Sequence, residues 1–198
     1  ETVFNQHFSR DRVDPGVPDP ALTELGRAQA LNAAQELIGF GIERIVASPY
    51  TRAIETALIV AELLDRPVEI DADIRERAGY SCDIGGDPAA LAAKWPRLDF
   101  GALEPLWWAH RAGDPNQGGL DEPEAALNAR VHGFCARISR RTDWAETLVV
   151  CHWGPIRALI GRRVENGVFV RHDPRGKTRP VTRRAVVSTR RFMLTRSR

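Results

Sequence analysis

Short apolar runs alternate with longer amphipathic stretches along most of the chain. Residues 45–48, 68–70 and 147–151 are rich in valine, isoleucine and leucine, and each run has about the length of one strand. Between these runs, apolar residues recur every three or four positions, as they do in a helix with one buried face. This alternation of strands and helices predicts a three-layer α/β/α sandwich with a mostly parallel central sheet.

Further strands are predicted near both ends of the sequence. The chain opens on a stretch, residues 3–10, in which a short apolar run predicts a strand and His7 stands at its exit. Two β-rich runs, around residues 168–170 and 185–194, predict a hairpin or an edge pair.

Four helices are predicted in addition to these strands. Thr23 is a suitable N-cap for a helix that runs to about residue 38, and the other helices are predicted over residues 51–64, 123–141 and 155–161. The first helix has an apolar face at helical spacing, formed by Leu22, Leu25, Ala28, Leu31 and Ala34.

Residues 79–119 interrupt the regular pattern. This stretch is rich in glycine and proline and holds Trp95, Trp107 and Trp108, three of the five tryptophans. We interpret it as an insertion that covers the crevice like a lid, with one short helix at residues 88–95, although such tryptophans are also typical of an ordinary core. The chain as a whole, residues 1–198, is predicted to form a single domain.

Composition restricts the class of protein. The 198 residues are 43% hydrophobic and 27% charged, and the net charge of +2 is too small to indicate nucleic acid or a membrane as partner. Three cysteines without CxxC spacing argue against a disulfide framework and a zinc site, and no run is long enough to span a bilayer. We therefore expect a cytoplasmic protein that acts on a small molecule without a metal or cofactor, and a homodimer is a further option.

Residues with useful chemistry gather at the predicted strand ends. His7 and His152 each follow a predicted strand, Arg52 comes shortly after another, and Glu76 follows a fourth. The carboxyl ends of parallel strands open onto one crevice, so these side chains are expected on the same rim. Two histidines, a guanidinium and a carboxyl group can supply the nucleophile, charge neutralisation and proton delivery that phosphoryl transfer needs.

Three motifs in sequence order carry a resemblance to a known family. Residues 19–30, DPALTELGRAQA, are similar to D-x-x-L-T-x-x-G-x-x-Q-A, and residues 47–57, ASPYTRAIETA, are similar to S-P-x-x-R-A-x-x-T-A. Residues 149–154, VVCHWG, resemble V-V-S-H-G-G. These are motifs of the histidine phosphatase superfamily, also called phosphoglycerate mutase-like, and the resemblance covers most of the chain.

The resemblance implies a role for each candidate residue. His7 would be the phosphorylated nucleophile, Arg52 a phosphate clamp, and His152 the second histidine that stabilises the transferring phosphoryl group. Glu76 matches the family's proton donor, while Asp83 in the adjacent loop is an alternative acid.

The sequence departs from the family pattern beside both histidines. The family's R-H-G reads Gln6-His7-Phe8 here, so a bidentate, permanently charged phosphate ligand is replaced by a neutral amide. Trp153 stands where the family has a glycine. Arg10, together with Arg12, is a candidate to bring a guanidinium back into the pocket.

Three functions are consistent with these observations. The first is hydrolysis of a small-molecule phosphomonoester through a phosphohistidine at His7. The second is an acid–base dehydration, elimination or isomerisation of an unphosphorylated substrate on the same fold, which Gln6, Phe8 and Trp153 favour. The third is a binding protein without catalytic activity, which the four matched polar residues argue against.

Overall fold

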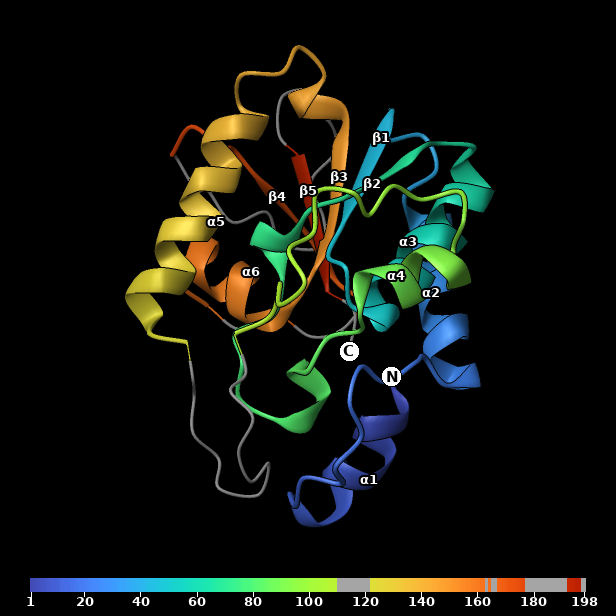
Figure 1. Ribbon diagram of the computed structural model, residues 1–198. Coiled ribbons are helices and arrows are strands. Elements are labelled where there is room, and N and C mark those ends of the chain that lie inside the picture. Colours follow the sequence, from blue (N-terminus) through green and yellow to red (C-terminus); the bar gives the residue numbers. More distant parts are fainter. Residues whose placement is uncertain (110–121, 163, 165–166, 177–191, 197–198) are drawn as a thin grey trace.

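A five-stranded sheet forms the centre of the molecule in the computed structural model, which describes residues 1–109, 122–162, 164, 167–176 and 192–196 (Figure 1). The strand order is β2-β1-β3-β5-β4, and all neighbours are parallel except β4 and β5, which are antiparallel. The strands are β1 (Arg44–Ala47), β2 (Val68–Ile70), β3 (Thr147–Cys151), β4 (Phe169–His172) and β5 (Phe192–Arg196). The predicted α/β class with a mostly parallel sheet is confirmed. Strands β4 and β5 form an antiparallel pair where the C-terminal pair was predicted, but residues 185–191 of the second predicted run lie outside the described residues.

Helices cover both faces of this sheet. On one side lie α2 (Glu24–Glu36) and α3 (Thr51–Leu64), and on the other lie α5 (Glu124–Ile138) and α6 (Trp153–Ile160) (Figure 1). Alternate strand residues face the two layers, because successive side chains of a strand point to opposite faces. The first layer receives Ile45, Ala47, Leu148 and Val150, and the second receives Val46, Val149 and Cys151.

Helix α2 begins where the sequence predicts but buries a different face. The Thr23 hydroxyl caps it by accepting a hydrogen bond of 3.0 Å from the Gly26 amide. Leu25 and Leu31, expected to be buried, are 55% and 43% exposed. The buried face consists of small residues, Gly26, Ala30, Ala33 and Ala34. Ala34 packs against Ala53 and Ala57 of α3, and Gly26 lies against the backbone of Glu1, so the larger leucines face outward.

The predicted N-terminal strand is wrong, because these residues form helix α1 (Val3–Asp11). Thr2 and Asn5 make a reciprocal capping box in which each side chain bonds to the backbone of the other residue. Phe4 and Phe8, one turn apart, stack with ring centroids 5.1 Å apart. Figure 1 shows α1 below the sheet, outside the two helical layers.

Each face of the sheet has its own apolar core, and part of the predicted insertion forms a small third core. Helix α4 (Pro88–Lys94) and the loop that follows it place Leu91, Phe100 and Trp107 against Tyr50 of the main body. Two short 3₁₀ helices, η1 (Ala72–Ile74) and η2 (Ser81–Asp83), connect β2 to α4. Residues 110–121 of the predicted lid lie outside the described residues, so a lid over the crevice stays a prediction.

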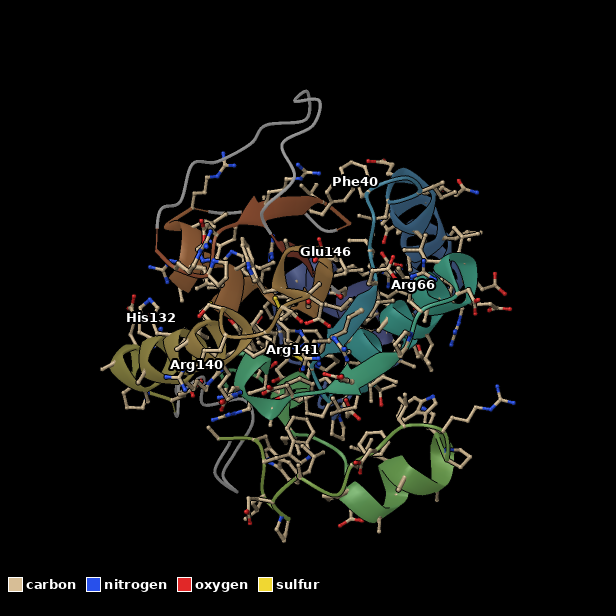
Figure 2. The ribbon with its side chains drawn as sticks, turned by 90° about the horizontal axis from the view of Figure 1, so that it is seen from above. Phe40, Arg66, His132, Arg140, Arg141 and Glu146 are labelled. Atoms are coloured by element: carbon tan, nitrogen blue, oxygen red, sulfur yellow. The ribbon has the colours of Figure 1, made fainter. Side chains whose placement is uncertain are left out.

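Charged side chains gather at the amino end of the sheet. Asp143, just before the 3₁₀ helix η4 (Trp144–Glu146), accepts hydrogen bonds from Arg44 at 2.7 Å and from Arg141 at 3.0 Å. Figure 2 views the molecule from this end, with Arg141 and Glu146 near its centre. None of the described helices has the length and apolar character needed to cross a membrane.

Candidate active site

A cavity of about 490 Å³ lies where the chain leaves the carboxyl ends of β1 and β3. Its wall combines polar groups from the β1–α3, β2–α4 and β3–α6 connections with side chains of α1. The lining residues are Thr2, Phe4, Asn5, Phe8, Ser9, Arg12, Pro20, Arg52, Glu76, Arg77, Gly79, Tyr80, Cys82, Asp83, His152, Trp153 and Arg157. The strand ends of the parallel sheet thus form the crevice that the topology predicts.

Arg52 is fixed in the cavity wall by its position in the first turn of α3. Asp19 holds the start of this helix, accepting hydrogen bonds from the Thr51 amide at 2.8 Å and the Thr51 hydroxyl at 2.6 Å. The guanidinium of Arg52 donates to the Cys82 carbonyl at 2.7 Å and pairs with Asp83 at 3.1 Å. The residue is 4% exposed, so this charge is held in one place away from bulk water.

Asp83 binds both Arg52 and the backbone of its own loop. One carboxylate oxygen accepts from Arg52, and the other accepts from the amides of Gly79 and Tyr80 at 3.1 and 3.2 Å. Burial raises the pKa of Asp83, and the charge of Arg52 opposes that rise. Both oxygens of Asp83 are therefore engaged in holding the loop and the guanidinium.

Glu76 presents a carboxyl group with one oxygen bound to backbone amides. Its Oε1 accepts hydrogen bonds from the amides of Arg77 and Gly154, both at 2.8 Å. Burial, and next the negative charge of Asp83, raise the pKa of Glu76 to about 7. This carboxyl group can exchange a proton near neutral pH.

His152 follows β3 and forms the N-cap of α6. Its Nε2 lies 2.8 Å from the Ser48 hydroxyl, and Tyr50 packs edge-on at a centroid distance of 5.2 Å. The residue is 1% exposed. The imidazole is thus oriented by residues at the end of β1, beside the first turn of α3.

The structure does not bring every predicted residue to this cavity. Gln6, His7 and Arg10 are exposed on α1 and do not line it, whereas Phe8 does. The physical reason is the helix itself, because residues 6, 7 and 10 project from other sides of it than Phe4 and Phe8. Of the histidines in the described part of the chain, His152 alone lines the cavity.

The remaining predicted residues are found together. Arg52, Glu76, Asp83, His152 and Trp153 all line the cavity. The tryptophans of the insertion that the structure describes do not line it and pack in or against the third core instead. Figure 2 shows His132 on the outer side of α5, and it does not line the cavity.

Sequence reasoning missed several residues of the wall. Tyr80 and Arg157 line the cavity and were not among the candidates, and of the two candidate arginines Arg12 lines it whereas Arg10 does not. The spacing of four between Phe8 and Arg12, and again between Trp153 and Arg157, was a usable signal for two helical faces directed at one cavity.

The described residues contain no cluster of three or more histidine, cysteine, aspartate or glutamate side chains placed to hold a metal ion. The polar groups of the cavity include the Arg52 guanidinium, the His152 imidazole and the Glu76 carboxyl group, whose pKa is raised. Such a set can bind an oxyanion and move a proton.

Comparison with known proteins gives a consistent set of similarities. The sequence profile of the histidine phosphatase superfamily (branch 1) matches residues 6–171. An uncharacterised protein of Mycobacterium tuberculosis is 31% identical over 159 residues, which are 80% of this chain and 73% of that protein. The solved structure of mycobacterial hydrolase 1 is 29% identical, covers 80% of this chain and 73% of its own, and superposes with a TM-score of 0.52.

Some of the similar proteins are named phosphatases. Glucosyl-3-phosphoglycerate phosphatase of Mycolicibacterium vanbaalenii is 30% identical over 162 residues, which are 76% of this chain and 68% of the relative. Phosphoserine phosphatase 1 of Hydrogenobacter thermophilus is 33% identical over 152 residues, which are 73% of this chain and 64% of the relative.

Proposed function

Because the chain belongs to the histidine phosphatase superfamily, we propose that it hydrolyses a small-molecule phosphomonoester in the cavity between α1 and the sheet. The observation that carries the proposal is the grouping of Arg52, Glu76 and His152 in one cavity wall. The names of two relatives, both phosphatases, support the same reaction class.

Each of the three groups has a task in this reaction. Arg52 binds the phosphate oxygens, and a guanidinium is well suited to this because its donors match an oxyanion. The imidazole of His152 attacks phosphorus, and water later hydrolyses the phosphohistidine and releases phosphate. Glu76 donates its proton to the oxygen of the leaving alcohol as the phosphorus–oxygen bond breaks, which its pKa of about 7 permits at neutral pH. Asp83 keeps Arg52 in position and is not the acid, since both of its oxygens are engaged.

We propose a phosphoryl acceptor other than His7, the residue that the resemblance implies. His7 is exposed on α1 and does not line the cavity, whereas His152 does. We therefore expect any phosphohistidine intermediate to form at His152.

The test begins with a panel of phosphomonoesters that includes phenyl phosphate and 4-nitrophenyl phosphate. Phosphate release is expected from the native chain. Glu76→Gln should lower kcat for phenyl phosphate by about 10²-fold to 10⁴-fold, because a general acid contributes about that much. The loss should be smaller for 4-nitrophenyl phosphate, whose leaving group needs less help from an acid.

The position of the acceptor is tested by mapping phosphorylated peptides after rapid mixing with substrate. His7→Ala is expected to keep kcat within about twofold of the native value, and His152→Ala to abolish turnover and any adduct. A phosphorylated His7 would contradict the assignment. If no phosphomonoester releases phosphate, the proposal fails and the acid–base reaction of an unphosphorylated substrate replaces it, for which the rings of Phe8 and Trp153 in the wall argue.

A further inference from the structure

Three aromatic rings from two separate segments form one continuous part of the cavity wall. Phe4 and Phe8 lie one turn apart on α1, and Tyr80 comes just before the 3₁₀ helix η2. The rings of Phe8 and Tyr80 meet edge-on with centroids 4.9 Å apart, and the Phe4 and Tyr80 centroids are 6.1 Å apart. All three residues line the cavity, so they present a shared aromatic surface to it.

The rings of this aromatic surface are buried to different degrees. Phe4 is 4% exposed and supports the other two, Phe8 is half-buried, and Tyr80 is 41% exposed although it lines a cavity. From α6, Trp153 adds a further half-buried ring to the same cavity. Apolar rings that stay accessible inside a ligand cavity indicate that an apolar part of the ligand is bound there.

The aromatic surface is tied to the position of Arg52. The Tyr80 amide donates to the Asp83 carboxylate at 3.2 Å, and the Asp83 amide donates to the Tyr80 carbonyl at 2.9 Å. The same carboxylate pairs with Arg52 at 3.1 Å. One side chain therefore holds both the backbone of Tyr80 and the guanidinium that binds phosphate in the proposed reaction, while packing on Phe8 orients the Tyr80 ring.

The charges of the cavity decide which kind of apolar group fits. Aromatic rings around a pocket can bind a quaternary ammonium ion through cation–π contacts. Here guanidinium groups already lie near two of the rings, with the guanidinium carbon of Arg12 5.7 Å from the Phe8 centroid and that of Arg157 5.2 Å from the Trp153 centroid. Both arginines line the cavity and would repel a cationic group. A neutral planar ring meets no such repulsion and packs well on other rings.

We infer that the alcohol part of the substrate carries a planar aromatic ring, and that this ring is bound on the surface formed by Phe4, Phe8 and Tyr80. The phosphate would lie at Arg52 and His152. Such a substrate differs from those in the names of the two phosphatase relatives, phosphoserine and glucosyl-3-phosphoglycerate, which contain no aromatic ring. The inference rests on the proposed function, because it names the class of phosphomonoester that is hydrolysed.

Two matched substrates separate aromatic planarity from apolar character. Benzyl phosphate and cyclohexylmethyl phosphate each join a six-carbon ring to the phosphate through one CH₂ group, and both release a primary alcohol. The native chain is expected to show a kcat/KM about threefold to tenfold higher for benzyl phosphate, as contacts between aromatic rings would give. Phosphocholine should be a poorer substrate than both, because its ammonium group meets the two arginines.

Variants then assign this preference to the aromatic surface. Tyr80→Leu and Phe8→Leu keep an apolar side chain but remove a ring, and each should lower the ratio of the two kcat/KM values toward one. Tyr80→Phe keeps the ring and should keep the ratio. Phe40→Leu is the matched control, because Phe40 is 39% exposed and packs edge-on against Phe169 but does not line the cavity (Figure 2). The ratio does not depend on the folded fraction, since both substrates are measured on one preparation.

Equilibrium binding of phosphonates, measured by calorimetry, gives a readout that does not need turnover. Benzylphosphonate should bind more tightly than cyclohexylmethylphosphonate by a similar factor. The absence of this preference in the native chain would overturn the inference, and so would a preference that survives in both leucine variants or a preference for phosphocholine. If both phosphates are hydrolysed without a benzyl preference, only the aromatic surface fails; if benzylphosphonate is preferred but neither phosphate is hydrolysed, the proposed function fails.

Discussion

At the scale of single residues, the carboxyl group of Glu76 receives two backbone hydrogen bonds and still holds a proton near neutral pH. The amides of Arg77 and Gly154 favour the ionised form, and burial together with the charge of Asp83 favours the protonated form. The second pair of effects is larger, so the pKa of Glu76 rises to about 7. A carboxylic acid of this kind is suited to protonating a leaving group.

This pKa predicts how activity depends on pH. A general acid must be protonated, and kcat/KM reports the ionisation of groups in the free enzyme. The kcat/KM for phenyl phosphate is therefore expected to fall as pH rises through about 7. The measurement is a pH–rate profile from pH 5 to 9. A profile that stays flat across pH 7 would exclude Glu76 as the acid of the rate-limiting step.

The same shift predicts how stability depends on pH. The folded pKa of about 7 lies above the ordinary value of 4.5, so the folded state binds the proton more tightly and loses stability as pH rises from 4.5 to beyond 7. The full shift corresponds to about 3 kcal/mol. Urea unfolding of Glu76→Gln should lack this loss, so the variant is expected to be more stable than the native chain at pH 8 and close to it at pH 4.5. Equal pH dependence in both chains would contradict the shift.

At the scale of elements, the first turn of α6 fixes the position of Glu76. The Gly154 amide donates to Glu76 Oε1 at 2.8 Å, and a side chain on residue 154 would run into this oxygen and approach Arg77. A glycine is needed here for close approach of the backbone rather than for an unusual φ.

Gly154→Ala is therefore expected to displace Glu76 and lower kcat/KM by at least about tenfold, since small displacements of catalytic groups are costly. Steady-state kinetics with phenyl phosphate measure this. Gly133→Ala on α5 is the matched control, because a Cβ there meets only Arg137 Nη1 at 4.0 Å. This control should keep native activity and gain up to about 1 kcal/mol of stability from the better helix propensity of alanine. Equal activity of the two variants would show that Gly154 has no special role.

Most elements could be predicted from the sequence because local signals agreed with the fold. The apolar run of β3 is buried throughout, and Thr23 caps α2 as its side chain and position suggest. Helix α1 was the exception, because the spacing of Phe4 and Phe8 fits a helix while the short apolar start also fits a strand. The choice depends on the Thr2–Asn5 capping box, which is a weak signal in a single sequence.

The site could be predicted where its residues follow strands of the sheet, and could not where they depend on α1. Arg52, Glu76 and His152 follow β1, β2 and β3, so the topology alone brings them together. The prediction for His7 started from a strand, and the chain forms helix α1 there, so His7 does not line the cavity. The exchange of Arg10 for Arg12 has the same origin, since the turn of the helix decides which arginine faces the cavity.

At the scale of the whole molecule, a buried charge cluster joins α5 to the segment that carries Glu76. Arg130 of α5 donates to the carbonyls of Asp73 and Arg75 at 2.7 and 2.8 Å, and Glu122 pairs with Arg130 at 2.7 Å. Glu122 also pairs with Arg75 at 3.3 Å and is 3% exposed. One carboxylate therefore neutralises two arginines between the helical layer and the cavity wall.

Glu122→Gln is expected to lower the free energy of unfolding by about 3 kcal/mol or more, because removing one partner leaves buried charge without compensation. The measurement is urea denaturation at pH 7. Arg137→Gln on the same helix removes a surface pair with Asp71 and Asp73 and should cost less than about 1 kcal/mol. A loss of the same size in both variants would contradict the importance given to Glu122.

The packing of Trp107 gives the molecule an optical property. Its indole N–H donates to the Gly86 carbonyl at 2.9 Å, and its ring meets Tyr50 and Trp108 edge-on at centroid distances of 4.7 and 5.4 Å. Aromatic rings held rigidly at such angles in a protein core produce circular dichroism in the near ultraviolet, and this signal disappears when fixed packing is lost. The backbone signal in the far ultraviolet comes mainly from the sheet and its helices. Comparing the two wavelength ranges during unfolding would therefore show whether the small third core separates from the sheet before the sheet itself unfolds.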